Sequence, residues 1–286
     1  LALRYLYQGE FELGWKYYSS YDPSIPNLYK HIKEYRDLKN FNLSNKHILV
    51  YNDQGIGDAI QFSKYIHQLL KKAGKITFSV QDNIYGLFKN DIKNLRIKKR
   101  SLEIIDDIDG KIALSSLIKY FYTTKLNDND HILKIKNKND LNLDIIKSNK
   151  KFNVGLAWSG SSISRSVPLK SFEKILNIDC NFYCLQNKIK DEDLDYFNSK
   201  NITDLGNFKL DELTAVIEKL DLVITIDTSL LHLSSSLNKE TWGILNIDPD
   251  WRWGAMYNYN PYSSLIIFRQ KIFNDWKDVT DKIYQK

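Results

Sequence analysis

One short turn in the first half of the chain combines two glycines with a carboxylate, Asp58, at the predicted start of a helix. Gln54 and Gly55 open this turn, and Gly57 directly precedes Asp58. Because glycine lacks a Cβ atom, another molecule can come close to the backbone here. A carboxylate in this place can take a proton as a general base, but it can also simply cap the helix. Position alone leaves both interpretations open.

A second turn, Asp227-Thr228-Ser229-Leu230, follows an unbroken apolar stretch and leads into a predicted helix. The two hydroxyls and the backbone N–H groups of a helix start form a suitable site for a diphosphate. Asp, Thr and Ser are also the usual capping residues, which is the simpler interpretation. His232 lies one turn further on among leucines, where it either contacts a ligand or is a hydrogen-bonded core histidine.

Polar residues after two other strand-like stretches complete the set of binding candidates. Ser159 and Gly160 open a loop that contains Arg165, whose guanidinium can bind phosphate oxygens in bidentate fashion. The alternative for Arg165 is an ordinary surface arginine. Gln186 follows the apolar stretch 182–185, and we group it with Asp227 and His232 as residues expected to line a substrate cleft.

The segment Asp248-Pro249-Asp250 has the DxD form found in metal-dependent sugar transferases. Pro249 and the adjacent Trp251-Arg252-Trp253 favour a structured turn instead, and Trp253 is a further candidate for the cleft. The histidines show no spacing typical of metal ligands. We therefore predict no metal and no cofactor.

Strands and helices alternate around the first turn. Residues 47–51 form a short apolar run, apolar residues recur at helical spacing from Phe62 to Ala73, and residues 76–80 form the next strand. This is a βαβ unit, so the strands should be parallel. Weaker patterns predict strands at 95–98, 102–105 and 111–114, helices at 84–90 and 115–122, and a polar linker stretch at 126–150.

The same alternation recurs around the second turn. Strands are expected at 152–158, 182–185, 222–226, 242–245 and 265–268, and helices at 210–220, 228–237 and from about residue 274. Two doubly wound α/β domains are the economical interpretation. In open parallel sheets ligands bind beyond the carboxyl ends of strands, which is where both turns lie.

Residues 1–40 differ from the rest because they predict two short amphipathic helices around Gly9. The pattern resembles the later part of a tetratricopeptide repeat, and a simple helical hairpin is the alternative. A lone repeat cannot bury both of its faces, and the chain opens at Leu1 instead of methionine. We therefore expect further repeats upstream.

Composition limits the class of protein. With 286 residues, 43% of them hydrophobic, the chain can form two domains with large cores. The net charge of +6 is spread along the chain, so no nucleic-acid partner is expected, although a local cluster would allow peripheral contact with a membrane. No apolar run reaches 18 residues and no signal peptide is present. Two thiols, Cys180 and Cys184, fit a reducing compartment, so we predict a cytoplasmic protein.

Five stretches together resemble glycosyltransferase family 9, the bacterial heptosyltransferase-like enzymes, and in particular the branch fused to tetratricopeptide repeats. They are Asp53–Phe62, Val154–Gly160, Leu222–Leu233, Pro249–Trp253 and Phe268-Arg269-Gln270 with Trp276 beyond. The resemblance covers residues 46–286. Ser229 departs from the glycine of true heptosyltransferases, so the resemblance does not identify the sugar.

The resemblance implies a GT-B fold, in which two Rossmann-like domains face each other across a cleft. Its parts would be the helical segment 1–40, an acceptor domain 46–150, a nucleotide-sugar domain 151–270, and a terminal helix 271–286 that crosses back to the first domain. It also implies inverting transfer without a metal from a nucleotide-sugar to a glycan, lipid-linked or protein acceptor. Asp58 matches the catalytic aspartate. The donor-phosphate site matches Thr228, Ser229, Leu230 and Arg165, with Ser159 and Gly160 beside it.

Two alternatives stay open. The chain could be a nucleotide- or sugar-binding module without activity, whose repeats dock a protein. It could instead modify a protein, in which case the sugar would appear on a serine or threonine. No motif names the base, the sugar, the acceptor or the oligomeric state.

Overall fold

The computed structural model describes residues 1–18, 29, 31–35, 38, 42–101, 107–121, 131–147, 150–160, 163–254 and 260–286. They divide into two compact units. Unit 1 comprises Leu1–Lys134 and Asp250–Tyr259, and unit 2 comprises Ile135–Pro249 and Asn260–Lys286. The chain thus leaves unit 2 after Pro249, contributes a short segment to unit 1, and returns.

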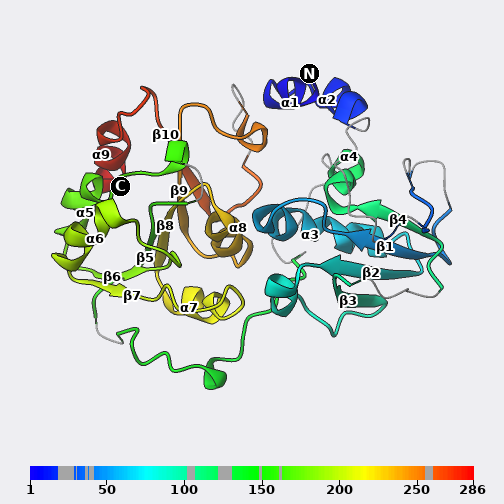
Figure 1. The fold of residues 1–286 in the computed structure, drawn as a ribbon, viewed down its shortest axis with the longest axis horizontal. Helices are drawn as coiled ribbons and strands as arrows, with labels where there is room; N and C mark the ends of the chain where they lie inside the picture. The colour runs from blue at the N-terminus through cyan, green and yellow to red at the C-terminus, as the bar shows by residue number, and fades with distance from the viewer. Residues whose placement is uncertain are drawn as a thin grey trace. The chain divides into compact units, whose positions relative to one another are not determined.

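Unit 1 is built on a four-stranded sheet in the order β3-β2-β1-β4, with every neighbouring pair parallel (Figure 1). The strands are β1 (His47–Tyr51), β2 (Lys75–Val80), β3 (Leu95–Lys99) and β4 (Gly110–Ala113). Helix α3 (Ile56–Leu70) connects β1 to β2, as the βαβ pattern predicts. Its apolar residues recur at helical spacing, and Ile60, Ile66 and Leu69 are fully buried. This packing fixes the start of α3 beyond the carboxyl end of β1.

Shorter helices complete unit 1. The weaker helical patterns become the 3₁₀ turns η2 (Asp82–Leu87) and η3 (Leu114–Leu117) and one α-helical turn, α4 (Ile118–Phe121). The strand expected at 102–105 lies outside the described residues.

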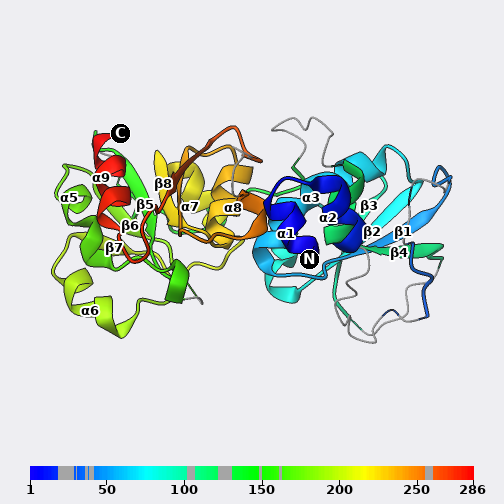
Figure 2. The same ribbon diagram turned by 90° about the horizontal axis from the view of Figure 1, so that it is seen from above.

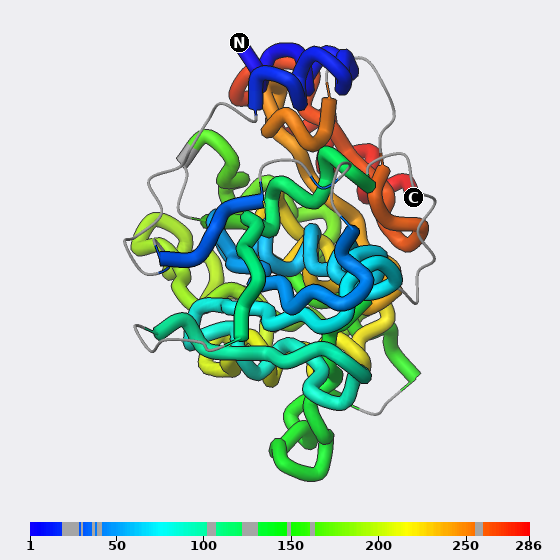
Figure 3. Tube along the Cα trace, turned by 90° about the vertical axis from the view of Figure 1, so that its right-hand side faces the viewer, coloured from blue at the N-terminus to red at the C-terminus, as the bar shows by residue number. Residues whose placement is uncertain are grey.

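The N-terminal hairpin consists of α1 (Ala2–Tyr7) and α2 (Phe11–Tyr18). The two helices expected around Gly9 are therefore confirmed, and Gly9 itself has a φ of 82°, which favours glycine. Helix α1 contacts the 3₁₀ turn η7 (Trp251–Trp253), which belongs to the returning segment of unit 1. Figure 3 shows the blue hairpin next to this orange turn. Membership of a tetratricopeptide repeat stays a prediction.

Unit 2 contains a six-stranded parallel sheet in the order β10-β9-β8-β5-β6-β7. Its strands are β5 (Asn153–Ala157), β6 (Asn181–Cys184), β7 (Ile202–Asp204), β8 (Leu222–Ile226), β9 (Thr241–Leu245) and β10 (Leu265–Arg269). Its helices are α5 (Glu173–Leu176), α6 (Asp191–Asn198), α7 (Leu213–Lys219), α8 (Ser229–Ser236) and α9 (Lys277–Gln285), with 3₁₀ turns at Lys138–Asp140, Ile163–Arg165 and Leu169–Phe172. The predicted α/β class with parallel sheets is confirmed. Every residue of β8 is buried, as expected for a central strand covered on both faces.

The terminal helix α9 differs from the expectation. Trp276, Val279 and Ile283 are buried in the core of unit 2, and α9 contacts α5 and β10 (Figure 2). The helix that the resemblance implies should cross to the first domain therefore buries its apolar residues within unit 2. The segment that does join unit 1 from the C-terminal part is Asp250–Tyr259, and the division between the units falls after Lys134 instead of residue 150.

No helix among the described residues is long and apolar enough to cross a membrane.

Substitution of Ile283 by alanine tests the placement of α9. Ile283 is 2% exposed in the core of unit 2, so the variant should lose about 2–5 kcal/mol in its free energy of unfolding, measured by urea denaturation. Tyr284→Ala is the matched control, because Tyr284 is 49% exposed on the same helix and should change stability by no more than about 0.5 kcal/mol. Equal effects of the two substitutions would contradict this packing.

Candidate functional site

Asp58 is held from two sides at the start of α3. Its Oδ2 accepts a hydrogen bond from the backbone N–H of Gly55 at 3.2 Å, and its Oδ1 forms an ion pair with Nη2 of Arg252. The first contact is the capping role that the sequence allows. The second adds a cation that comes from 194 residues along the chain. Asp58 therefore caps its helix and is also part of a charged cluster within unit 1.

Arg252 is fixed by several contacts besides Asp58. Its Nη1 pairs with Asp250 at 2.5 Å, and its backbone N–H donates to the same carboxylate at 3.1 Å. The guanidinium carbon lies 5.6 Å from the ring centroid of Phe62 and 5.2 Å from that of Trp251, within cation–π range. Only 16% of the Arg252 side chain is exposed. The guanidinium is thus held in one place instead of sampling many rotamers.

Burial raises the pKa of the Asp58 carboxyl above its ordinary value, and the nearby carboxylates of Asp250 and Asp53 raise it further. Arg252 acts in the opposite direction through its charge and its hydrogen bond. The net shift is upward, because removal from water disfavours the charged form more than a single guanidinium favours it. A carboxylate with a raised pKa is a stronger base than one on the surface, which suits proton abstraction near neutral pH.

A second carboxylate, Asp53, lies at the same end of the sheet. It accepts hydrogen bonds from the backbone N–H of Ser115 at 3.0 Å and from the Ser115 hydroxyl at 2.5 Å. Tyr18, the last residue of α2, is hydrogen-bonded to Ser115 as well. Burial first, and then the charge of Asp53, raise the pKa of Tyr18 to about 12, so its hydroxyl stays protonated at neutral pH. The N-terminal hairpin therefore reaches the carboxyl edge of the sheet that carries Asp58.

The glycines of this turn have ordinary backbone angles. Gly55 has a φ of −67°, and Gly57 is not among the residues with positive φ. A Cβ added at Gly55 would meet only Asp58 Oδ2, at 3.3 Å. Their glycine character is thus consistent with close approach of another molecule and is not required by backbone conformation. The carbonyl of Gln54 accepts hydrogen bonds from Asn52 and Gln81, which fixes the turn.

In unit 2, Thr228 is the N-cap of α8 and its side chain makes no capping hydrogen bond. The helix begins at Ser229, so the N–H groups of Ser229 and Leu230 have no partner one turn earlier in the helix. Thr228 and Ser229 are half-buried, and Leu230 is buried. A Cβ at Gly160 would lie 3.2 Å from the methyl group of Thr228, so the loop after β5 and the start of α8 are neighbours.

Charged and polar side chains surround this second turn. Nη1 of Arg165 lies 3.5 Å from Oδ2 of Asp227, with 42% of the arginine side chain exposed. His232 is 5% exposed, and its Nδ1 lies 2.9 Å from the hydroxyl of Tyr262. Its Nε2 is 4.0 Å from Oδ1 of Asp227. His232 is thus a hydrogen-bonded buried histidine next to the turn, and Arg165 is a partly exposed cation beside the turn.

Gln186 organises the loop that begins at Ser159. Its Oε1 accepts the N–H groups of Trp158 and Ser159 at 2.9 and 3.0 Å, and its Nε2 donates to Ser159 Oγ and to the carbonyl of Lys188. The amide is 6% exposed, and these four hydrogen bonds use its donors and acceptor. Gln186 therefore positions Ser159 and does not itself offer groups to a ligand.

The structure brings the predicted residues together in two groups. One group shares a turn in unit 1 and consists of Asp58, Gln54, Gly55 and Gly57. The other group lies in unit 2 and consists of Thr228, Ser229, Leu230, Arg165, Asp227, His232, Ser159, Gly160 and Gln186. Trp253 lies in unit 1 and is 1% exposed, so it packs in the interior.

Among the described residues, no group of three or more His, Cys, Asp or Glu side chains could hold a metal ion. Asp250 of the DxD-like segment is engaged by Arg252.

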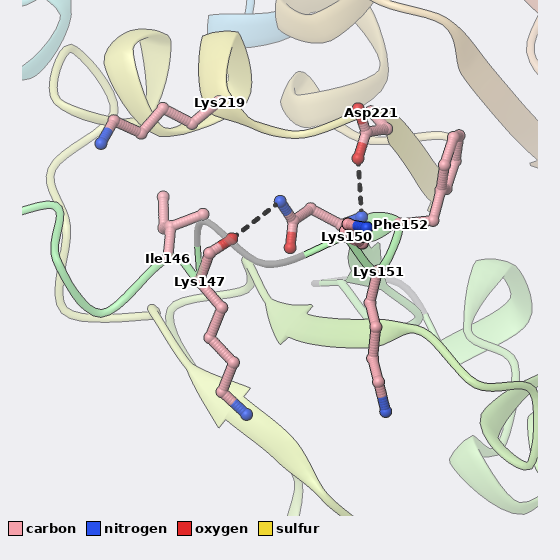
Figure 4. Close-up of a pocket in the computed structure, with 8 residues that line it drawn as sticks. Ile146, Lys147, Lys150, Lys151, Phe152, Lys219 and Asp221 are labelled. Carbon is pink, nitrogen blue, oxygen red and sulfur yellow. Dashed lines mark hydrogen bonds between the residues drawn. The ribbon is translucent and has the colours of Figure 1, made fainter.

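A pocket of about 470 Å³ lies at the opposite, amino-terminal edge of the unit 2 sheet, next to Asn153 and Asp221. Lysines line it, and the amino group of Lys219 points away from those of Lys147 and Lys151 (Figure 4). Because ligands of parallel sheets bind at the carboxyl ends, this pocket does not compete with the turn before α8 as the candidate site.

Sequence reasoning missed Arg252, Tyr18 and Ser115 as partners of the acidic turn. Arg252 stood inside the motif Pro249–Trp253, so the signal was present, but its contact with Asp58 spans 194 residues. The pairing could not be inferred from local spacing.

Comparison with known proteins supports the resemblance. Residues 185–272 match the model of glycosyltransferase family 9 (heptosyltransferase). This stretch contains the whole turn before α8 and Arg252, but not Asp58. The matched stretch is a glycosyltransferase domain, so the chain is an enzyme of the glycosyltransferase kind. No curated protein sequence matches the chain.

Solved structures share the fold at low sequence identity. A family 9 glycosyl transferase from Veillonella parvula aligns with a TM-score of 0.61 and 12% identity, over 85% of this chain and 90% of that chain. The E. coli heptosyltransferase WaaC with ADP aligns with a TM-score of 0.57 and 11% identity, over 84% and 98%. The heptosyltransferase TibC in complex with ADP-D-beta-D-heptose aligns with a TM-score of 0.58 and 10% identity, over 84% and 67%. These likenesses establish the fold.

Arg252→Gln tests the electrostatics of the Asp58 cluster. Since Arg252 is the cation that lowers the pKa of Asp58, its loss should raise that pKa further. The measurement is a ¹³C NMR titration of aspartate carboxyls, with the Asp58 signal assigned from its absence in Asp58→Asn. Lys46→Gln is the control, because Lys46 pairs with Asp109 on the surface. An unchanged Asp58 titration in Arg252→Gln would show that the pair does not form in solution.

Proposed function

We propose that the chain is a metal-independent, inverting glycosyltransferase that moves a sugar from a nucleotide-sugar donor to a hydroxyl acceptor. The observation that carries the proposal is Asp58, a largely buried carboxylate with a raised pKa, held by Arg252 at a glycine-containing turn. Its place at the carboxyl end of β1 is where open parallel sheets bind ligands. The match of residues 185–272 to glycosyltransferase family 9 agrees with this chemistry.

The start of α8 is proposed to bind the donor diphosphate. The N–H groups of Ser229 and Leu230, together with the positive end of the helix dipole, stabilise an anion. The Arg165 guanidinium, which lies 3.5 Å from Asp227 and is partly exposed, can turn to phosphate oxygens. ADP and ADP-heptose are the ligands named for the similar heptosyltransferases, so ADP-sugars are the first donors to test.

In the proposed reaction Asp58 takes the proton of an acceptor hydroxyl as that oxygen attacks the anomeric carbon. The bond between the anomeric carbon and the diphosphate oxygen breaks, and the nucleoside diphosphate leaves with the electron pair. The groups at the start of α8 and Arg165 stabilise the negative charge that develops on this leaving group. The acceptor is a glycan, a lipid-linked sugar or a protein.

Asp58→Asn tests the base. Transfer from ADP-heptose or another nucleotide-sugar of a panel should fall about 10²–10⁴-fold, because general-base assistance is lost. Affinity for ADP, measured by calorimetry, should not change, since the diphosphate turn is untouched. Asp91→Asn is the control, because Asp91 is an exposed aspartate of the same unit. Full activity of Asp58→Asn would remove this residue from the mechanism. Nucleotide binding without transfer from any donor would favour a binding module instead.

Arg165→Ala tests the donor site. Loss of a charge-assisted hydrogen bond costs about 1.5–3 kcal/mol, so the dissociation constant for ADP should rise about tenfold or more. Lys170→Ala removes an exposed cation from the same part of unit 2 and should have little effect. If both variants bind ADP as well as the unaltered chain, the diphosphate does not lie at this arginine.

A further inference from the structure

Aromatic rings connect the N-terminal hairpin to the returning segment of unit 1. The ring of Trp15 in α2 meets Trp251 edge-on, with centroids 5.5 Å apart. Tyr18 packs against Trp15 at 5.3 Å and against Trp251 at 6.4 Å. Trp15 is 3% exposed, so the contact is part of the interior and not a chance meeting of surface side chains. The hairpin therefore limits where the Trp251 ring can lie.

Trp251 in turn limits where the Arg252 guanidinium can lie. The guanidinium is 5.2 Å from the Trp251 ring and 5.6 Å from the Phe62 ring, which belongs to α3. From this position its Nη2 pairs with Asp58 and its Nη1 with Asp250. The contacts thus run without interruption from the hairpin, through one tryptophan and one arginine, to the candidate base.

We propose that the N-terminal hairpin is a positioning element for Asp58: Trp15 and Tyr18 hold Trp251, and Trp251 holds the guanidinium that orients the carboxylate. The catalytic meaning of this arrangement rests on the proposed role of Asp58. The hairpin is then part of the machinery of unit 1 and not only an arm that could dock a protein. Trp15, Tyr18, Trp251 and Arg252 are positioning residues, because they act through Asp58.

The direction of the expected effect follows from the charges that face Asp58. These are Arg252 and Asp250 from the returning segment and Asp53 from the turn after β1; Tyr18 from α2 stays neutral. Of these charged groups, Arg252 is the one that favours the ionised carboxylate, and the Gly55 N–H hydrogen bond acts in the same direction. If the ring support is removed, the guanidinium spends less time on Asp58, and the pKa of Asp58 should rise in the same direction as in Arg252→Gln.

The test is a ¹³C NMR titration of Asp58 in variants of the full chain. Trp15→Leu, Trp251→Leu and Tyr18→Leu should each raise the pKa of Asp58, by less than Arg252→Gln does. Tyr18→Phe keeps the ring against Trp251 and should restore the unaltered titration. Tyr17→Leu is the matched control, because Tyr17 is 39% exposed on the same helix and stacks on Tyr5, away from Trp251. If Trp15→Leu does not fold, the Tyr18 pair gives the answer.

An unchanged Asp58 titration in Tyr18→Leu and Trp251→Leu, with a raised one in Arg252→Gln, would overturn the positioning role of the hairpin. This measurement needs no substrate, so it separates the inference from the proposed function: a chain without transferase activity can still show the shifts. Where transfer is measurable, a second signature is expected. The acid limb of its pH profile, which reports the ionised base, should move to higher pH in Tyr18→Leu and not in Tyr17→Leu.

Discussion

The ion pair between Asp58 and Arg252 is the interaction on which the account of unit 1 depends. It joins the start of α3 to the segment Asp250–Tyr259, which follows most of unit 2 in the sequence. Both side chains are largely buried, with 17% and 16% exposed. Removing two charges from water is costly, and a pair of this kind persists only where the geometry and additional hydrogen bonds offset that cost. Here Gly55 and Asp250 supply those further contacts.

The same arrangement explains how a carboxylate can be both held and reactive. Burial and two neighbouring carboxylates push its pKa upward, while one guanidinium restrains that rise and fixes its orientation. If Arg252 dominated, the carboxylate would be a weak base; if it were absent, more of the carboxyl would be protonated and unable to accept a proton. The aromatic rings of Phe62 and Trp251 hold the guanidinium in the position from which it acts on the pKa of Asp58.

Unit 2 also has a parallel sheet, and its candidate site is suited to binding an anion instead of accepting a proton. There, the turn beyond β8 leads into α8, whose first N–H groups have no helical partners, and Arg165 is a partly exposed cation beside it. The surrounding side chains are tied to one another: Gln186 fixes the loop at Ser159, and Tyr262 fixes His232. A rigid frame with one partly exposed arginine is what an anion site requires, since little order must be imposed when the ligand arrives.

Local pattern was sufficient to predict the elements that bury most apolar surface. Helix α3 and strands β1, β5 and β8 follow directly from periodicity and apolar runs. The short edge strand β7 was not predicted, because Ile202-Thr203-Asp204 carries almost no pattern. The weak helical patterns became two 3₁₀ turns and one short α-helical turn. The expectation that the last helix crosses to the first domain came from the family resemblance, whereas α9 packs in the core of unit 2. For the candidate site, sequence identified Asp58 and the α8 turn. It could not identify Arg252 or Tyr18, whose roles arise from contacts across the fold.

A double-mutant cycle on Asp58→Asn and Arg252→Gln measures the central interaction most directly. The free energies of unfolding of the unaltered chain, the two single variants and the double variant would be obtained by urea denaturation at neutral pH. Because each single change leaves a buried partner behind, the double variant should be less destabilised than the sum of the two by about 1 kcal/mol or more. Effects that add to within about 0.5 kcal/mol would mean that the two residues do not interact in solution, and would contradict the account.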